Sequence, residues 1–433
     1  MDTHTHKALP IELNNKRTIN AWAFFDWANS AFALVITVAI FPGYFTEVTA
    51  DSLRFFGVEM SNEALYSYSI SAAYLIIAIL SPILSGIADY GGKKMVFMRF
   101  FTAIGSIACI SLYWFQGTDQ LYLGVFGFIL GMVGFAGGQV FYNSYLPQIA
   151  SEDRLDVVSA KGFTFGYVGS VILLVINLLL ITNPAWFGLP ETGTFTVRLA
   201  FIMVGLWWIG FAIIPFSRLP KDTKGHTKGL VSKGFKELQK VWDFLRHQRY
   251  IKIFLLAFFF YNAGVQTVLY LAAIFAKKEL GFDTGELIIV VLILQVVAIG
   301  GAHLFAKLSG IKGNKFAIML MLVIWIVICF LAYFVTGQMD FYVLAGGVGL
   351  VMGGIQSLSR STYAKLLPTS LEDTASFFSF YEVVDKISII IGTFSFGLIA
   401  NMTGSMRISI LVLGVYFLIG LIILRKVKIV AAK

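Results

Sequence analysis

Residues 86–94 read Gly-Ile-Ala-Asp-Tyr-Gly-Gly-Lys-Lys, and they complete an apolar run that starts near residue 65. Gly86 permits close contact between helices, and the pair of glycines at 91 and 92 permits a tight turn. The two lysines after that turn suit a phospholipid surface, and Asp89 is an acid at the same end of the helix. The stretch therefore indicates two membrane-spanning helices joined by a short basic loop.

The composition of the whole chain is that of a membrane protein. Of its 433 residues, 58% are apolar and 13% are charged, whereas a soluble domain has about 45–50% apolar and about 25% charged residues. So few charges cannot cover the surface of a soluble enzyme. Both cysteines lie in apolar runs, the histidines have no metal-ligand spacing, and no phosphate-binding loop is present. We therefore expect no enzyme, no metal site, no disulfide framework and no cofactor.

Twelve apolar segments are long enough to cross a bilayer as helices, for which about 20 residues suffice. They cover residues 20–47, 65–89, 95–115, 121–147, 159–182, 197–217, 251–276, 285–308, 316–336, 340–366, 374–400 and 407–427. Backbone polar groups in lipid must be satisfied within each segment, which favours helices throughout. The sequence predicts an all-α membrane protein with twelve transmembrane helices.

The positions of the basic residues predict the orientation. With the N-terminus inside, the outer connections carry few of the 33 Lys and Arg residues, namely Arg54, Arg198, Lys277, Lys278 and Arg407. Because cytoplasmic loops carry the excess of basic residues, both termini are predicted to be cytoplasmic and the first span to be an uncleaved signal anchor. The same rule accounts for the net charge of +9 without a nucleic-acid partner.

The longest internal connection, residues 218–250, divides the spans into six and six. Within it, apolar residues recur at helical spacing with Lys and Arg between them, namely Phe235, Leu238, Val241, Trp242 and Leu245. This pattern predicts an amphipathic helix on the inner membrane face, and the alternative is a solvated linker. We predict an N-terminal six-helix bundle over residues 1–217, a basic linker over 218–250 and a C-terminal six-helix bundle over 251–433.

The two halves also repeat in sequence. GGQVFYNSYLPQIA from Gly137 is similar to GGIQSLSRSTYAKLLP from Gly353, and SAKGFTFGYVGSVI from Ser159 is similar to TASFFSFYEVVDKI from Thr374. The two similarities occur in the same order at the same place in each half. Parallel six-helix repeats of this kind are the architecture of major facilitator transporters.

The stretch at residues 86–94 resembles the GxxxDxxGRRK signature of the major facilitator superfamily, between its second and third helices. The resemblance implies that Asp89, Lys93 and Lys94 belong to a cytoplasmic gate, in which Asp89 meets the positive N-terminal end of the eleventh helix. The second half reads GAHLFAKLSGIKGNK from Gly301, with Lys307 where an acid would be expected. We therefore expect a weaker lock in the second half.

Residues 22–33 read WAFFDWANSAFA and closely resemble the WAxYDWANSAxA signature of the autophagy-related vacuolar amino-acid effluxer family. This family is a branch of the major facilitators with many bacterial members, so the resemblance implies an amino-acid substrate and a bacterial inner membrane. Polar groups in a spanning helix are costly unless they line a cavity. Asp26 lies only about 8 Å into the first helix. We therefore expect Asp26 at the cytoplasmic gate and Asn29 in the substrate cavity.

Glu382, Asp385 and Lys386 place three charges near the middle of the eleventh span. Glu382 and Lys386 are spaced i,i+4 and can pair on one face, and Asp385 shares that side. A carboxyl group held beside another carboxylate can take up and release a proton, which predicts that Glu382 and Asp385 couple transport to protons. The alternative is an ion pair that only holds helices together.

Arg360 in the tenth span lies about 12 Å from the cytoplasmic end, at the same estimated depth as Glu382. Arginine suits bidentate binding of a carboxylate, so Arg360 is either the counter-ion of Glu382 or a ligand for a substrate carboxylate. Lys386 is a second candidate for substrate binding. Further candidates that could line the cavity, or alternatively join helices by hydrogen bonds, are Asn143, Asn262 and Gln266.

These features predict a secondary transporter that moves a small solute by alternating access, coupled to a proton or another ion. Opposite charges at similar depth suit a zwitterion such as an amino acid. Two other classes stay open, which are a lipid or lysolipid transporter of the same fold and a non-transporting membrane sensor. We expect a monomer surrounded by membrane lipids.

Overall fold

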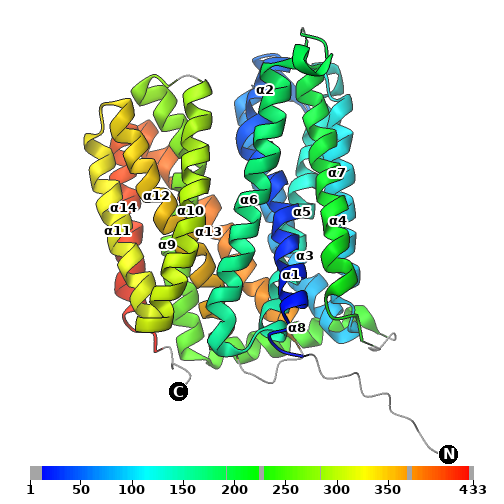
Figure 1. Ribbon diagram of the computed structural model, residues 1–433, viewed down its shortest axis with the longest axis vertical. Coiled ribbons are helices and arrows are strands. Elements are labelled where there is room, and N and C mark those ends of the chain that lie inside the picture. The colour runs from blue at the N-terminus through cyan, green and yellow to red at the C-terminus, as the bar shows by residue number, and fades with distance from the viewer. Residues whose placement is uncertain (1–11, 192, 224–228, 283, 368–372, 429–433) are drawn as a thin grey trace, which may run out of the picture.

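The computed structural model describes residues 12–191, 193–223, 229–282, 284–367 and 373–428 (Figure 1). Within these residues, twelve helical segments are long and apolar enough to cross a membrane, which confirms the predicted class and number of spans. The spans are formed by α1 (Lys16–Ala31) with α2 (Phe41–Val48), α3 (Asn62–Gly91), α4 (Lys94–Ser111), α5 (Leu121–Ile149), α6 (Leu155–Thr182), α7 (Phe195–Arg218), α9 (Arg249–Leu280), α10 (Thr284–Lys312), α11 (Asn314–Phe334), α12 (Gln338–Leu366), α13 (Thr374–Thr403) and α14 (Met406–Leu424). The connecting segment contains α8 (Leu230–His247).

Short elements complete the fold. Strands β1 (Ser52–Phe55) and β2 (Val58–Ser61) form an antiparallel hairpin between the first two spans, which the all-α prediction does not include. Single 3₁₀ turns lie at the ends of several spans, namely Leu112–Trp114, Thr118–Gln120, Glu152–Arg154 and Pro184–Phe187.

The first span is not one regular α-helix. A π-helical segment over Phe32–Ile40 joins α1 to α2, and at its end the N–H of Phe41 donates to the carbonyl of Ile36, five residues earlier. Such segments rotate the following residues relative to an α-helix and are frequent at functional sites. Here the span keeps both Asp26 and Val38 against the same central cavity.

The helices form two groups that pack against each other across one interface. Figure 1 shows α1–α7 on one side (the N-terminal bundle) and α9–α14 on the other (the C-terminal bundle), with α8 beneath them. Across the interface α3 packs on α13, and α6 packs on α10 and α12. We call the end that carries α8 the α8 face and the opposite end the far face. The predicted domain bounds, residues 1–217, 218–250 and 251–433, stay a prediction.

The linker helix α8 is packed against protein over part of its surface. A Cβ atom on Gly86 of α3 would lie 2.4 Å from the carbonyl oxygen of Gly234, so the two helix backbones touch. Val241 and Leu245 are buried, and the ring of Trp242 lies 5.7 Å from that of Phe380 on α13. The helix α8 therefore contacts both bundles, through α3 and α13, and its position on the inner membrane face stays a prediction.

The exposed side of α8 keeps part of the predicted pattern. Phe235 is 49% exposed and Trp242 54% exposed, which suits the predicted position at a membrane surface. Lys240 lies 3.1 Å from Glu237 and 3.4 Å from Asp373. The hydrogen bond to Glu237 and the charge of Asp373 raise the pKa of Lys240, so this ammonium group stays charged at neutral pH.

Helices α10 and α12 approach each other so closely that glycine is required. A Cβ atom on Gly353 would lie 2.1 Å from the carbonyl oxygen of Ala298, whereas one on Gly346 of the same helix would meet nothing within 4 Å. Gly→Ala inside a helix normally stabilises by about 0.5–1 kcal/mol, but overpacking costs about 1–3 kcal/mol. We expect Gly353→Ala to lower the thermal unfolding midpoint in detergent and Gly346→Ala to leave it unchanged or raise it. Equal midpoints for the two variants would contradict this packing.

Candidate functional site

A polar cavity of about 280 Å³ lies between the two bundles. The N-terminal bundle contributes α1, α3, α5 and α6 to its wall, and the C-terminal bundle contributes α9, α10, α12 and α13. Among the residues that the structure describes, five charged ones line it, namely Asp26, Arg360, Glu382, Asp385 and Lys386. A cavity that gathers buried charges of both signs from both bundles is the candidate functional site of the molecule.

Arg360 extends from α12 across the interface into the N-terminal bundle and is only 3% exposed. Its Nη1 lies 3.3 Å from Asp26 Oδ2 and donates to Asn143 Oδ1 at 3.1 Å. Its Nε donates to Ser159 Oγ at 2.9 Å, and its Nη2 donates to the Ser159 carbonyl at 2.8 Å. Every one of these acceptors belongs to the opposite bundle.

Aromatic rings enclose the same guanidinium group. Its Cζ lies 4.3 Å from the ring centroid of Phe163, 4.8 Å from that of Trp22 and 5.4 Å from that of Tyr142. Tyr142 also donates a hydrogen bond of 2.6 Å to Asp26. Desolvated cation–π contacts of this kind strengthen the hold on an arginine.

These contacts correct one expectation. The counter-ion of Arg360 is Asp26, so the predicted Arg360–Glu382 pair is wrong. Depth along a helix does not determine the direction of a side chain, and Arg360 points towards α1 and α6 rather than α13. Asp26 lines the cavity beside Arg360, and its predicted role at the cytoplasmic gate stays a prediction.

The charges of α13 form a second cluster. Lys386 Nζ lies 2.5 Å from Asp385 Oδ2 and 3.1 Å from Glu382 Oε2, which confirms the predicted i,i+4 pair. Asn143 Nδ2 donates to Glu382 Oε1 at 2.8 Å, and Asn262 Nδ2 donates to Asp385 Oδ1 at 2.8 Å. Since the Oδ1 of Asn143 accepts from Arg360, this one amide connects the two charged clusters.

The other predicted cavity residues divide into two groups. Asn143, Asn262 and Gln266 line the cavity as expected. Asn29 does not, because it lies on a neighbouring face of α1 that is fully buried inside the protein. Both polar atoms of its amide are buried without a hydrogen-bond partner among the described residues.

Two tyrosines lie beyond the α13 charges, towards the far face. Tyr74 Oη and Tyr270 Oη are 2.5 Å apart and join α3 to α9 across the two bundles. Tyr270 follows Asn262 by eight residues and Gln266 by four, so the three share one face of α9. The ring centroid of Tyr74 lies 5.7 Å from Lys386 Nζ. No motif in the sequence pointed to this pair.

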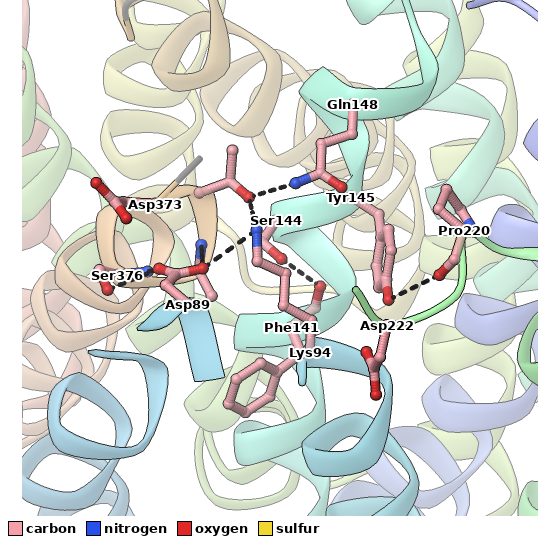
Figure 2. A network of polar contacts seen from close by, with 12 residues as sticks. Asp89, Lys94, Phe141, Ser144, Tyr145, Gln148, Pro220, Asp222, Asp373 and Ser376 are labelled. Atoms are coloured by element: carbon pink, nitrogen blue, oxygen red, sulfur yellow. Dashed lines mark hydrogen bonds and ion pairs between the residues drawn. The ribbon is translucent and has the colours of Figure 1, made fainter. Parts of the chain in front are cut away.

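On the α8 face, Asp89 joins α3 to the start of α13 (Figure 2). It accepts hydrogen bonds of 2.7 Å from both the backbone N–H and the hydroxyl of Ser376, and one of 3.3 Å from the N–H of Ala375. This is the predicted contact with a helix N-terminus. Lys94 lies 3.1 Å from Asp89, while Lys93 is exposed, and the predicted role of both lysines in a gate stays a prediction.

The same region anchors the beginning of the linker, as Figure 2 shows. The carboxylate of Asp222 accepts from the backbone N–H groups of Met95 at 2.7 Å and Val96 at 3.2 Å, so it caps the N-terminus of α4. Tyr145 donates to the carbonyl of Pro220 at 3.4 Å. The linker therefore holds the start of α4, which carries Lys94, in a defined position.

A second inter-bundle junction on the α8 face surrounds Asp156, which is buried in the first turn of α6. Lys365 Nζ of α12 lies 2.7 Å from its carboxylate, Asn314 Nδ2 of α11 donates to it at 2.8 Å, and the hydroxyl of Ser309 of α10 donates to it as well. The sequence predicts a weaker lock here because Lys307 replaces an acid. In the structure Lys307 is exposed, and the acid of this junction comes from the N-terminal bundle.

Comparison with solved structures defines the class of the fold. The transporter FucP of the major facilitator superfamily, in its outward conformation, matches with a TM-score of 0.69 and 15% identity over 95% of this chain and 98% of that chain. The human organic anion transporter MFSD10 matches with a TM-score of 0.72 and 10% identity over 95% and 100% of the two chains. The chain has the major facilitator fold.

Sequence comparison narrows the class to one family. The model of the family described as vacuole effluxer Atg22 like matches residues 14–433, and the chain belongs to this family. The uncharacterized MFS-type transporter YxiO of Bacillus subtilis is 33% identical over 94% of this chain and 93% of its own length. Autophagy-related protein 22 of Kluyveromyces lactis is 28% identical over 84% and 79%. These findings place the chain among the transporters of the major facilitator superfamily.

Proposed function

We propose that the protein is a secondary transporter that carries a small zwitterionic solute, such as an amino acid, through the central cavity by proton-coupled alternating access. The observation that carries this proposal is the buried set of opposite charges which both bundles contribute to one polar cavity. The five charged residues in its lining favour a polar solute over a lipid, because buried charges are costly unless they meet polar or charged groups. A family of vacuole effluxers supports the same class of function.

The contacts at the α8 face support an alternating mechanism. Asp89 with Ser376 and Asp156 with Lys365 join the bundles on that side of the cavity. Both junctions have to separate before a solute can leave the cavity towards the α8 face. The likeness to FucP in its outward conformation supports a state that is closed on this face.

Arg360 links the cavity to the separation of the two bundles at the α8 face. It belongs to the C-terminal bundle, yet Asp26, Asn143 and Ser159 of the N-terminal bundle hold it. When the bundles separate on the α8 face, this buried cation loses its partners, and an unpaired buried charge is strongly unfavourable. A change of charge in the cavity, through a substrate or a proton, is therefore the natural trigger for the movement.

Glu382 and Asp385 are the proposed proton carriers. Both lie in the cavity wall, and both share the single counter-ion Lys386. Protonation of one of them removes the excess negative charge, and release restores it.

The proposed coupling is tested with purified protein in liposomes that contain the pH indicator pyranine. We expect externally added amino acids, tried one at a time, to cause a substrate-dependent pH change. Glu382→Gln should reduce this signal at least tenfold, whereas Asp340→Asn, an exposed carboxylate at the far end of α12, should preserve it. pH-driven transport that persists when both Glu382 and Asp385 are neutralised would show that the coupling proposal is wrong.

We propose that the α8 face is cytoplasmic, because the basic linker lies there and basic loops stay on that side. The chain would then be a multi-pass protein of a bacterial inner membrane with both termini inside. We propose a monomer with two bundles, surrounded by lipid, that works without a cofactor or nucleic acid.

A further inference from the structure

The charges that line the cavity do not balance. Asp26, Glu382 and Asp385 are acids, and Arg360 and Lys386 are the bases, so one negative charge is in excess when all are ionised. A buried charge without a partner is costly. The cavity therefore has to bind one further positive charge, and the two available forms are a proton and a cationic group of the substrate.

Arg360 has little capacity left for a substrate carboxylate. Four of its hydrogen bonds go to three residues of the N-terminal bundle, and aromatic rings cover its faces. Lys386 is likewise held between Glu382 and Asp385. The described cations of the cavity are thus already neutralised, and an anionic substrate group would have to displace a protein carboxylate.

Asp385 is the most accessible of the three acids. Its side chain is 13% exposed, compared with 7% for Glu382 and 4% for Asp26. On α9, Gln266 and Tyr270 continue outward from Asn262, the hydrogen-bond partner of Asp385. A group that enters the cavity from the far face passes these side chains before it reaches Asp385.

The tyrosine pair lies on that route. Asp89 contacts Ser376 at the α8 face, so depths along α3 and α13 can be counted from this contact. Tyr74 lies about 22 Å from Asp89 towards the far face, and Lys386 lies about 15 Å from Ser376 in the same direction. Tyr74, hydrogen-bonded to Tyr270, is therefore on the far-face side of the Asp385–Lys386 pair. Aromatic faces attract cations, and tyrosine is among the better rings for this.

On the basis of the proposed function, we infer that the cavity recognises its substrate through a protonated amine, which binds Asp385 beneath Tyr74 and Tyr270 and competes there with the coupling proton. Under the proposed coupling, the proton carried by the acids of this cluster leaves to the solution when the amine binds, and the carboxylate of Asp385 pairs with the ammonium group. Charge is conserved in this exchange, since one positive charge replaces another. The substrate class is then primary amines, of which amino acids are one member, and a substrate carboxylate is not required.

Three matched compounds separate the amine from the carboxylate. In the pyranine liposomes we would add leucine, leucinamide (amine present, carboxylate blocked) and N-acetylleucine (amine blocked, carboxylate present). We expect leucine and leucinamide to release protons and N-acetylleucine to be silent. Asp385→Asn removes the excess negative charge and with it the exchanged proton, so its affinity for leucinamide is read from the ligand-induced rise of the thermal midpoint in detergent. It should fall by roughly 10–150-fold, the loss typical of a charged hydrogen bond. Asp385→Glu should recover part of it, and Asp340→Asn should match the unmodified protein.

The outcomes distinguish this inference from the proposed function. A signal with N-acetylleucine but not with leucinamide would overturn the amine inference and leave amino-acid transport standing. Silence of all three compounds would also overturn it, and only silence of the complete amino-acid panel would overturn the proposed function. Tyr270→Phe keeps the ring and should keep the preference for amines, whereas equal losses in Tyr270→Phe and Tyr270→Ala would contradict the role of the aromatic face. Elution profile and thermal midpoint identify a variant that fails to fold.

Discussion

Arg360→Ala is expected to abolish transport and to lower the stability of the protein by about 3–5 kcal/mol, the typical cost of breaking a buried ion pair from one side. The change leaves Asp26 buried without its counter-ion and removes the hydrogen bonds to Asn143 and Ser159. It also empties the aromatic cage around the guanidinium group. Transport is measured in liposomes and stability by thermal unfolding in detergent.

A double variant separates the effect of an unpaired buried charge from the effect of the lost side-chain contacts. Asp26→Asn together with Arg360→Gln removes both charges, so it should recover much of the lost stability without recovering transport, because no uncompensated charge stays buried. Asp26→Asn alone should also lower stability and abolish transport, because it leaves Arg360 buried without its counter-ion. If Arg360→Ala melts at the same temperature as the unmodified protein, the Asp26–Arg360 pair is not a structural element of the cavity.

Asp156→Asn is expected to shift the protein towards a state that is open on the α8 face. The carboxylate is the common acceptor for Lys365, Asn314 and Ser309, so its loss weakens all three contacts between the bundles. A charged hydrogen bond contributes about 1.5–3 kcal/mol. That energy corresponds to a change of roughly 10–150-fold in the ratio of closed to open molecules.

The opening is measured through the labelling rate of a single cysteine at Ser357, which is fully buried where α12 meets α6. Cys109 and Cys329 would be replaced by alanine, and a membrane-impermeant maleimide would be added to the α8 face of inside-out vesicles. Asp153→Asn makes the same chemical change on an exposed acid three residues earlier. Labelling should accelerate with Asp156→Asn and not with Asp153→Asn. Equal rates would show that Asp156 does not hold this face closed.

Much of the fold can be predicted from the sequence because the bilayer strongly constrains which segments can cross it. Apolar length identifies each span, because a helix needs about 20 apolar residues to cross the bilayer. The contact of Asp89 with the start of α13 could be predicted because both partners occupy ends of helices, where motif and helix polarity determine what they meet. The pairing of Glu382 with Lys386 could be predicted because both lie on one helix.

Contacts between helices that are far apart in the sequence could not be predicted in this way. Depth along a helix places Arg360 and Glu382 at one level, but only the packing of α1, α5 and α6 turns Arg360 towards Asp26. Asp156 reads from the sequence as an acid near a helix N-terminus, and nothing in its surroundings indicates Lys365, 209 residues later. The π-helical segment and the Tyr74–Tyr270 pair likewise depend on packing that no local pattern encodes.

Counterflow in liposomes tests most directly whether the protein is an alternating-access carrier that works through this cavity. Liposomes loaded with an excess of unlabelled leucine, or of another amino acid that gives a pyranine signal, receive a trace of the labelled compound outside at equal pH. A carrier has to exchange one molecule for another, so the label should accumulate transiently above its equilibrium level, and Arg360→Ala should remove this overshoot. Absence of an overshoot for every amino acid, or an overshoot unchanged by Arg360→Ala, would contradict transport through the Asp26–Arg360 cavity.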